Sequence, residues 1–286
     1  MTASKNPKLS IVTPVLNGIR YIEFCIQNVI DQKCPEAEHI IIDGGSTDGT
    51  LDIIKRYVRA YSHIRWVSER DRGQSDAMNK GIQMARGAII SFLNVDDFYE
   101  PNLFTRVLKL FEALPSPSFV TGNCRVWDNE GKIAYVSCPS KLRLFHLMMG
   151  SEIHPFPLNP SSYFYHKVLH DFVGKYNVNS HYNLDQEFIF KVARKIKMIY
   201  INEVWGNFRL IEGTKTYKDL HGGTLFERQK FFLSTFWKQL PLQDKMQFYF
   251  YKLYRSLFFR FRRILSYYIP LLCKISKTKT KNRLGN

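Results

Sequence analysis

The sequence predicts an α/β fold, in which a mixed and mainly parallel sheet carries helices on both faces. Short apolar runs alternate with segments whose apolar residues recur at helical spacing through the first half of the chain. Such alternation of strands and helices is typical of a parallel sheet that is covered on both sides. A periodic aromatic and basic segment near the C-terminus adds a predicted amphipathic helical tail.

The elements of the first half follow from these patterns in chain order. The apolar runs predict strands at Leu9–Val15, Ile40–Ile42, Ile64–Val67 and Ala88–Leu93. The helical stripes predict helices at Ile19–Ile30, Leu51–Tyr61 and Ser75–Ala85.

The second half has a looser pattern. We predict strands at Phe119–Val126, Lys132–Ser137 and Lys197–Ile201 and a helix at Leu184–Lys195. Three prolines make the segment 152–160 a loop. We therefore expect one domain over residues 1–235, with halves at 1–115 and 116–235, followed by a tail at 236–286.

Charge is distributed unevenly along the chain. The formal net charge is +16, and residues 241–286 hold eleven Lys or Arg against the single acid Asp244, which accounts for +10. This asymmetry indicates a basic tail with an anionic partner surface. Five scattered cysteines without a C-x-x-C pair suggest neither a zinc site nor a disulfide framework. With no apolar run of about 18 residues, we expect a cytoplasmic protein.

Polar residues follow four of the predicted strands. They lie at Thr13–Asn17, Asp43–Gly45, Gly73–Asp76 and Asp96–Asp97. Because ligands bind at the carboxyl edge of such sheets, we expect these loops to share one crevice. Two adjacent carboxylates there fit a hard divalent cation whose coordination is completed by substrate phosphates. The alternative is that Asp96 and Asp97 cap a helix that begins near Pro101.

The segments 10–18, 39–50, 71–81 and 93–97, taken together, resemble the family 2 glycosyltransferases of the WcaA-like bacterial polysaccharide type. The resemblance implies a GT-A fold that binds a nucleotide sugar. It also implies a Mn²⁺ or Mg²⁺ cofactor held by Asp96 and Asp97. Many relatives begin this last motif with Asp where this chain has Asn94, so Asp96 becomes the principal metal ligand. The nucleotide-binding residues implied by the resemblance are Thr13, Pro14, Asn17, Asp43, Arg72 and Asp76, with Asp43 on the uracil.

The family resemblance also implies a catalytic base. A base must take the proton of the acceptor hydroxyl as that oxygen attacks the sugar. Asp185 aligns with the family's catalytic acid, and Glu187 is held in reserve. The alternative is that these two acids only stabilise the N-terminus of their helix.

Further predictions concern the segment that closes over the donor and the pocket that binds the acceptor. Lys215 lies in a segment that resembles the one closing over the diphosphate, although it could equally belong to a solvated loop. His154, Asn159 and Ser161 lie where relatives shape the acceptor pocket.

The segment 245–269 has aromatic residues on one helical face and Lys or Arg on the other. This pattern is typical of a helix that lies on an anionic membrane surface, although a helix packed on the domain or on a dimer partner remains an alternative. We expect an inverting enzyme, peripheral on the inner face of the plasma membrane, that uses a UDP-sugar and a lipid-linked glycan but no nucleic acid. A sugar-nucleotide nucleotidyltransferase and a non-enzymatic membrane-surface binding protein are the alternatives.

Overall fold

The computed structural model describes residues 6–150, 154–179 and 183–260. The chain divides into two compact units, Met1–Phe232 and Leu233–Asn286. The predicted boundary between domain and tail, at residue 235, lies close to this division.

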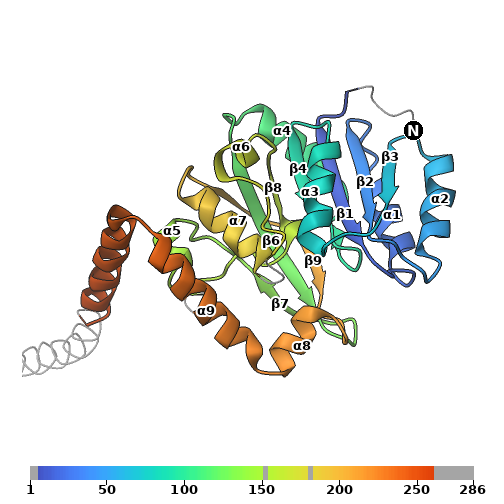
Figure 1. Cartoon of the computed structure of the whole chain (residues 1–286). Helices are drawn as coiled ribbons and strands as arrows, with labels where there is room; N and C mark the ends of the chain where they lie inside the picture. Colours follow the sequence, from blue (N-terminus) through green and yellow to red (C-terminus); the bar gives the residue numbers. More distant parts are fainter. Residues whose placement is uncertain (1–5, 151–153, 180–182, 261–286) are drawn as a thin grey trace, which may run out of the picture. The chain divides into compact units, whose positions relative to one another are not determined.

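The first unit contains a mixed sheet of nine strands, with helices between them (Figure 1). The strands are β1 (Leu9–Val15), β2 (Ala37–Asp43), β3 (Ile64–Ser68), β4 (Ile89–Phe92), β5 (Phe98–Tyr99), β6 (Phe119–Trp127), β7 (Ile133–Ser137), β8 (Tyr163–His166) and β9 (Ile199–Arg209). The helical elements are α1 (Ile22–Ile30), α2 (Thr50–Ala60), α3 (Gln74–Met84), α4 (Leu103–Glu112), α5 (Leu144–Leu147), the 3-10 turn η1 (Pro160–Ser162), α6 (Leu169–Val173), α7 (Leu184–Ala193), α8 (Lys215–His221) and α9 (Thr224–Gln239).

The sheet joins two groups of parallel strands. Its order is β3-β2-β1-β4-β8-β6-β9-β5, and β7 pairs with β6. Strands β1 to β4 are parallel to one another, and β6 is parallel to β9. Strand β8 lies antiparallel between β4 and β6. The carboxyl ends of β1 to β4, β6 and β9 and the start of β8 therefore meet at one edge.

Helices cover both faces of this sheet, as the sequence predicts. Leu9 and Ile11 of β1 point into a core that they share with α1 and α4. Val12, the residue after Ile11, points to the other face, where it contacts Gly81 of α3. On that second face, the Phe188 ring of α7 lies 4.8 Å from the Tyr165 ring of β8. The alternation of side chains along each strand thus distributes apolar residues to both helical layers.

Strands β9, β5 and β8 depart from the predicted pattern. The strand predicted at Lys197–Ile201 continues to Arg209 as β9, because it pairs with β6 along most of its length. Strands β5 and β8, of two and four residues, are absent from the prediction.

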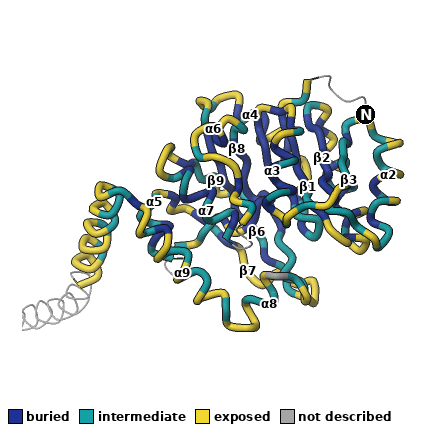
Figure 2. Tube along the Cα trace, in the orientation of Figure 1, coloured by how far each residue is buried: buried dark blue, intermediate teal, exposed yellow. Residues whose placement is uncertain are grey.

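The second unit contains a helix over residues 242–260. Most of its side chains are exposed, whereas the central strands of the first unit are buried (Figure 2). Large apolar side chains account for much of this exposure, among them Phe250, Leu253, Tyr254 and Leu257. The part of the predicted amphipathic segment beyond residue 260 lies outside the described residues. In the described part of the chain, no helix is long and apolar enough to span a bilayer.

Candidate active site

Hydrogen bonds of Asp43 and Asn17 stabilise two neighbouring loops at the carboxyl edge of the sheet. The fully buried Asp43 carboxylate accepts hydrogen bonds from Ser68 Oγ at 2.6 Å and from Ser46 N at 3.1 Å. Asn17 has a left-handed backbone (φ 52°), and its Oδ1 accepts from Thr47 N at 2.9 Å. The loop after β1 is therefore tied to the turn after β2. Contact of these residues with a nucleotide stays a prediction.

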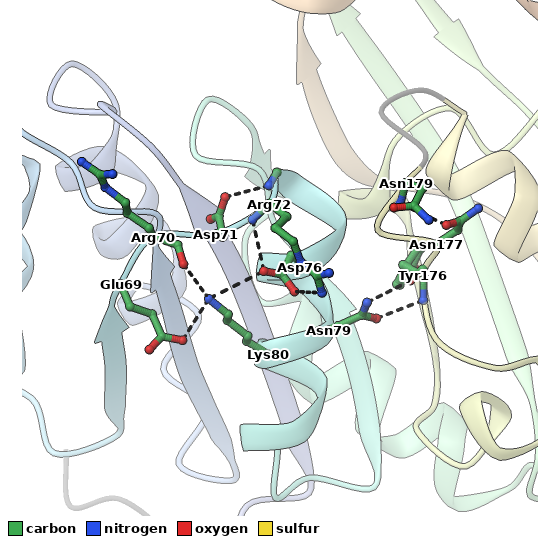
Figure 3. Close-up of polar contacts among 11 residues, drawn as sticks. Glu69, Arg70, Asp71, Arg72, Asp76, Asn79, Lys80, Tyr176, Asn177 and Asn179 are labelled. Carbon is green, nitrogen blue, oxygen red and sulfur yellow. Dashed lines mark hydrogen bonds and ion pairs between the residues drawn. The ribbon is translucent and has the colours of Figure 1, made fainter.

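The loop between β3 and α3 is held by a charged network (Figure 3). Asp76 accepts from Arg72 N at 3.1 Å, and the Arg72 guanidinium lies 3.6 Å from the same carboxylate. Lys80, one turn further along α3, contacts Glu69 at 2.9 Å and Asp76 at 3.8 Å. These contacts hold the predicted donor-binding residues Arg72 and Asp76 in one compact turn.

Gly44 allows the network to approach the turn after β2. A Cβ at this position would lie 2.6 Å from Asp71 Oδ2. The backbone at Gly44 can therefore pack against the Asp71 carboxylate only because glycine has no side chain.

The two acids after β4 have different environments. Asp97 is fully buried, and its carboxylate accepts from Asn159 Nδ2 at 2.7 Å, Asn94 Nδ2 at 2.9 Å and Arg209 N at 3.1 Å. The Asp96 carboxylate is partly exposed and makes no hydrogen bond or ion pair with another described residue. Helix α4 begins at Leu103 without a side-chain cap, so the capping alternative for these acids is excluded.

The electrostatics of this acidic turn fit a cation. Burial, followed by the neighbouring Asp96 carboxylate, raises the pKa of Asp97 well above its ordinary value. Burial likewise raises the pKa of Asp96, while nearby Arg209 lowers it. A divalent cation would relieve this cost through the free oxygens of Asp96. Among the described residues no group of three or more His, Cys, Asp or Glu side chains could hold a metal, so further ligands would come from phosphates and water.

A cavity of about 300 Å³ connects this turn with Asp185. Its lining includes Gln74 and Asn94 from residues 1–115 and Asn159 and Asp185 from residues 116–235. Asp185, in the first turn of α7, accepts a hydrogen bond from Tyr163 Oη at 2.7 Å. Burial raises the pKa of Asp185 to about 6, although the hydrogen bond from Tyr163 lowers it. A carboxylate with this pKa is suited to accept a proton near neutral pH.

Several predicted residues lie away from this cavity. Thr13 is buried, and its hydroxyl contacts the His39 ring at 2.9 Å. Ser161 is buried and bonds to Asn159 Oδ1, so it supports the asparagine that holds Asp97. Glu187 pairs with Lys191 at 2.6 Å and lines a different, small pocket.

The remaining predicted site residues are Pro14, His154 and Lys215. Pro14 is a partly exposed residue of β1. His154 packs against His146, with ring centroids 5.2 Å apart. Lys215 begins α8, and its side chain lies outside the described part of the chain. The structure therefore brings Asn159 and Asp185 together around one cavity, and Asn94 and Asn159 of that cavity bond to Asp97. It does not bring Glu187 or His154 there.

Residues 10–159, which are more than half of the chain, match glycosyl transferase family 2. The chain belongs to this family. The family region includes the four loops and the Asn159 that binds Asp97, whereas Asp185 lies beyond it. The resemblance noted in the sequence is thereby confirmed.

One curated relative and two solved structures are similar to this chain. The chondroitin synthase of Escherichia coli is 32% identical over 132 residues, which are 46% of this chain and 19% of that protein. Among solved structures, S. aureus TarS 1-349 in complex with UDP-GlcNAc has a TM-score of 0.57 at 18% identity, covering 72% of this chain and 60% of that one. The mannosyltransferase PcManGT from Pyrobaculum calidifontis, in complex with GDP-Man and Mn²⁺, has a TM-score of 0.54 at 17% identity, covering 74% and 59%.

These comparisons confirm the predicted GT-A fold of this family 2 member. The chain spans less than two thirds of the length of each of these relatives, and about a fifth of the chondroitin synthase.

Sequence reasoning missed several residues of the site in this family 2 chain. Gln74 Nε2 donates to Asn94 Oδ1 at 3.1 Å, which joins α3 to the acidic turn. Tyr163 precedes Asp185 by 22 residues, and no sequence pattern links the two. Arg209 carried a weak signal, because it begins the segment that resembles the diphosphate-closing loop; the structure places it at the end of β9.

Proposed function

We propose that this protein is a glycosyltransferase that moves a sugar from a nucleotide-sugar donor to a hydroxyl group of a glycan acceptor. One observation carries the proposal: Asp185, with a pKa of about 6, shares a cavity with the two asparagines that hold the acidic turn. The candidate proton acceptor therefore shares one space with the asparagines that hold the candidate cation site. Family 2 membership supports the same chemistry.

Asp185 acts as the general base in this proposal. The acceptor oxygen attacks the anomeric carbon as the bond from that carbon to the diphosphate oxygen breaks. The hydroxyl proton passes to Asp185, and the nucleoside diphosphate leaves with the electron pair of the broken bond. A single displacement of this kind inverts the anomeric configuration. Tyr163 holds the Asp185 carboxylate in orientation through its 2.7 Å hydrogen bond.

Asp96 is the proposed ligand of Mn²⁺ or Mg²⁺, with Asp97 held behind it. When bound, the divalent cation neutralises charge on the leaving diphosphate. The hydrogen bonds from Asn94, Asn159 and the Arg209 backbone fix Asp97, and with it the turn that presents Asp96. The PcManGT complex with Mn²⁺ supports a metal in this role.

A UDP-sugar is the proposed donor, and a lipid-linked glycan of cell-surface polysaccharide synthesis is the proposed acceptor. The TarS complex with UDP-GlcNAc supports a uridine nucleotide, and Asp43 would then lie nearest the uracil. Both hexosyl and N-acetylhexosaminyl donors fit this class.

The tail is proposed to hold the enzyme on an anionic membrane surface at the inner face of the plasma membrane. Exposed aromatic side chains on the helix 242–260, together with the +10 charge of residues 241–286, support this placement. The domain over residues 1–235 would then work on acceptors that are anchored in the same membrane.

A panel of nucleotide sugars, screened for release of the nucleoside diphosphate with Mn²⁺ present, tests the activity. We expect turnover with at least one UDP-sugar and a loss of about 100-fold or more in kcat for Asp185→Asn. Glu187→Gln removes only the ion pair with Lys191, so its kcat should stay within about twofold of the wild type. No turnover with any donor, or equal losses in both variants, would contradict the proposal.

A further inference from the structure

Arg209 lies beside the acid Asp96 without forming an ion pair with it. Its backbone N–H donates to Asp97 Oδ1 at 3.1 Å, which fixes the origin of the side chain at the acidic turn. In the described part of the chain, the guanidinium and the Asp96 carboxylate make no hydrogen bond or ion pair with each other or with any other side chain. Neighbouring opposite charges attract, so their separation needs a physical cause.

Two phenyl rings supply that cause. The guanidinium carbon of Arg209 lies 4.4 Å from the ring centroid of Phe24 and 4.9 Å from that of Phe98. These distances are within the range of cation–π attraction. The two rings also contact each other edge to face, at 5.6 Å and 88°. Phe24 and Phe98, defined here as the aromatic clamp, therefore hold the guanidinium from two elements, α1 and β5.

The clamp rests on a fixed support. The Phe98 ring lies 6.0 Å from the ring of Trp127 at the end of β6. Trp127 Nε1 donates to the buried Asn207 Oδ1 at 2.9 Å, and Leu210 N donates to Trp127 O at 2.9 Å. The chain on both sides of Arg209 is thus bonded to Trp127, whose ring supports the clamp.

The clamped guanidinium remains within reach of a ligand. Arg209, Phe98 and Trp127 line a cavity of about 790 Å³, together with Arg20, Asp128 and Glu212. Asp128 Oδ1 already accepts from Glu130 N and Lys132 N within its own turn. The N–H donors of Arg209 that the rings leave uncovered are therefore available to an anionic oxygen in this space.

We infer that Phe24 and Phe98 are positioning residues, which hold Arg209 off Asp96. The carboxylate then stays free for a divalent cation, and the guanidinium stays free for a phosphate oxygen of the donor. Without the clamp, Arg209 would neutralise the carboxylate and compete with the metal. This inference rests on the proposed function, since it assumes that a metal-bound diphosphate occupies the site.

The test measures Mn²⁺ binding by the full chain, from the electron paramagnetic resonance signal of free Mn²⁺ without nucleotide. We expect Phe24→Leu/Phe98→Leu to bind Mn²⁺ about tenfold more weakly than the wild type, or about 1.4 kcal/mol. Phe24→Leu alone, at a position 44% exposed, should fold normally and lose about threefold. Phe226→Leu, an exposed aromatic residue of α9, is the matched control and should change nothing.

Replacing Arg209 distinguishes the loss of the clamp from a general structural effect of the two Phe substitutions. Adding Arg209→Met to the double variant should restore Mn²⁺ affinity to the wild-type value or above, because no cation remains to occupy Asp96. Arg209→Met alone should bind Mn²⁺ normally but bind UDP with Mn²⁺ several-fold more weakly.

Unchanged Mn²⁺ affinity in the double variant, or a loss that Arg209→Met does not restore, would overturn the clamp alone. If the wild type binds no Mn²⁺ either with or without UDP, both the clamp and the proposed metal-dependent function are overturned.

Discussion

Asp185 owes its raised pKa to burial, and it lines a cavity that it shares with Gln74 and Asn94. If it is the base, kcat should rise with pH up to about 6 and level off above, because only the ionised carboxylate accepts a proton. Tyr163→Phe removes the hydrogen bond that lowers this pKa, so the rising limb should move to higher pH. Profiles of kcat against pH for both proteins measure this. A rising limb that stays at the same pH in Tyr163→Phe, or moves to lower pH, would contradict the assignment of Asp185 as the base.

The same pKa makes a prediction about stability. The pKa of Asp185 is about 6 in the folded protein, which is above its unfolded value. The protonated carboxyl group therefore contributes its full stability below pH 4, and this contribution is lost as pH rises through about 6. Asp185→Asn should therefore increase the free energy of unfolding at pH 8 by about 1 kcal/mol and give no gain at pH 4. Urea unfolding at both pH values measures the difference, with Asp52→Asn on the exposed face of α2 as control. A stability loss at pH 8 would contradict this account.

At the scale of single residues, the sequence predicted the acidic pair but not the different environments of its members. Asp97 is buried by partners that lie 62 and 112 residues further along the chain, at Asn159 and Arg209. Contacts at such separations leave no periodic pattern in the sequence. The exposure of Asp96 is likewise a product of tertiary packing.

At the scale of elements, α3 depends on one close approach to the sheet. A Cβ at Gly81 would overlap Val12 of β1. Gly81→Ala should therefore destabilise the protein by about 1–3 kcal/mol, although alanine favours helices. Because α3 carries Asp76, donor affinity should fall as well. Thermal unfolding and UDP titration measure both effects.

Gln83→Ala, at an exposed position of the same helix, is the control and should be nearly neutral. A variant at Gly81 as stable as the wild type would show that the helix shifts at no cost.

The predicted and observed elements agree where a pattern is long and periodic. The strand over 9–15 matches β1, and the predicted helices at 51–61 and 75–85 match α2 and α3 within one residue at each end. Strand β5 has two residues, too few to show alternation, and its pairing with β9 depends on residues about a hundred positions away. Strand β9 extends past the predicted end because β6 offers it a partner.

At the scale of the whole molecule, the tail gives the chain its strongest charge asymmetry. If residues 241–286 dock on anionic lipid, the full chain should float with phosphatidylglycerol vesicles, and a truncation before Pro241 should not. Raising salt should release the full chain, because screening weakens attraction between its basic residues and the lipid. Vesicles of phosphatidylcholine alone are the control. Equal flotation of the two proteins would contradict a membrane role for the tail.

The central claim is that Asp96 presents a cation to the diphosphate of a nucleotide donor. Titration of UDP by calorimetry, with and without Mn²⁺, tests it most directly in the wild type, in Asp96→Asn and in the Asp52→Asn control. The account predicts that Mn²⁺ strengthens UDP binding about tenfold or more in the wild type and the control but not in Asp96→Asn. Equal Mn²⁺ dependence in all three proteins, or UDP binding that Mn²⁺ never changes, would contradict it.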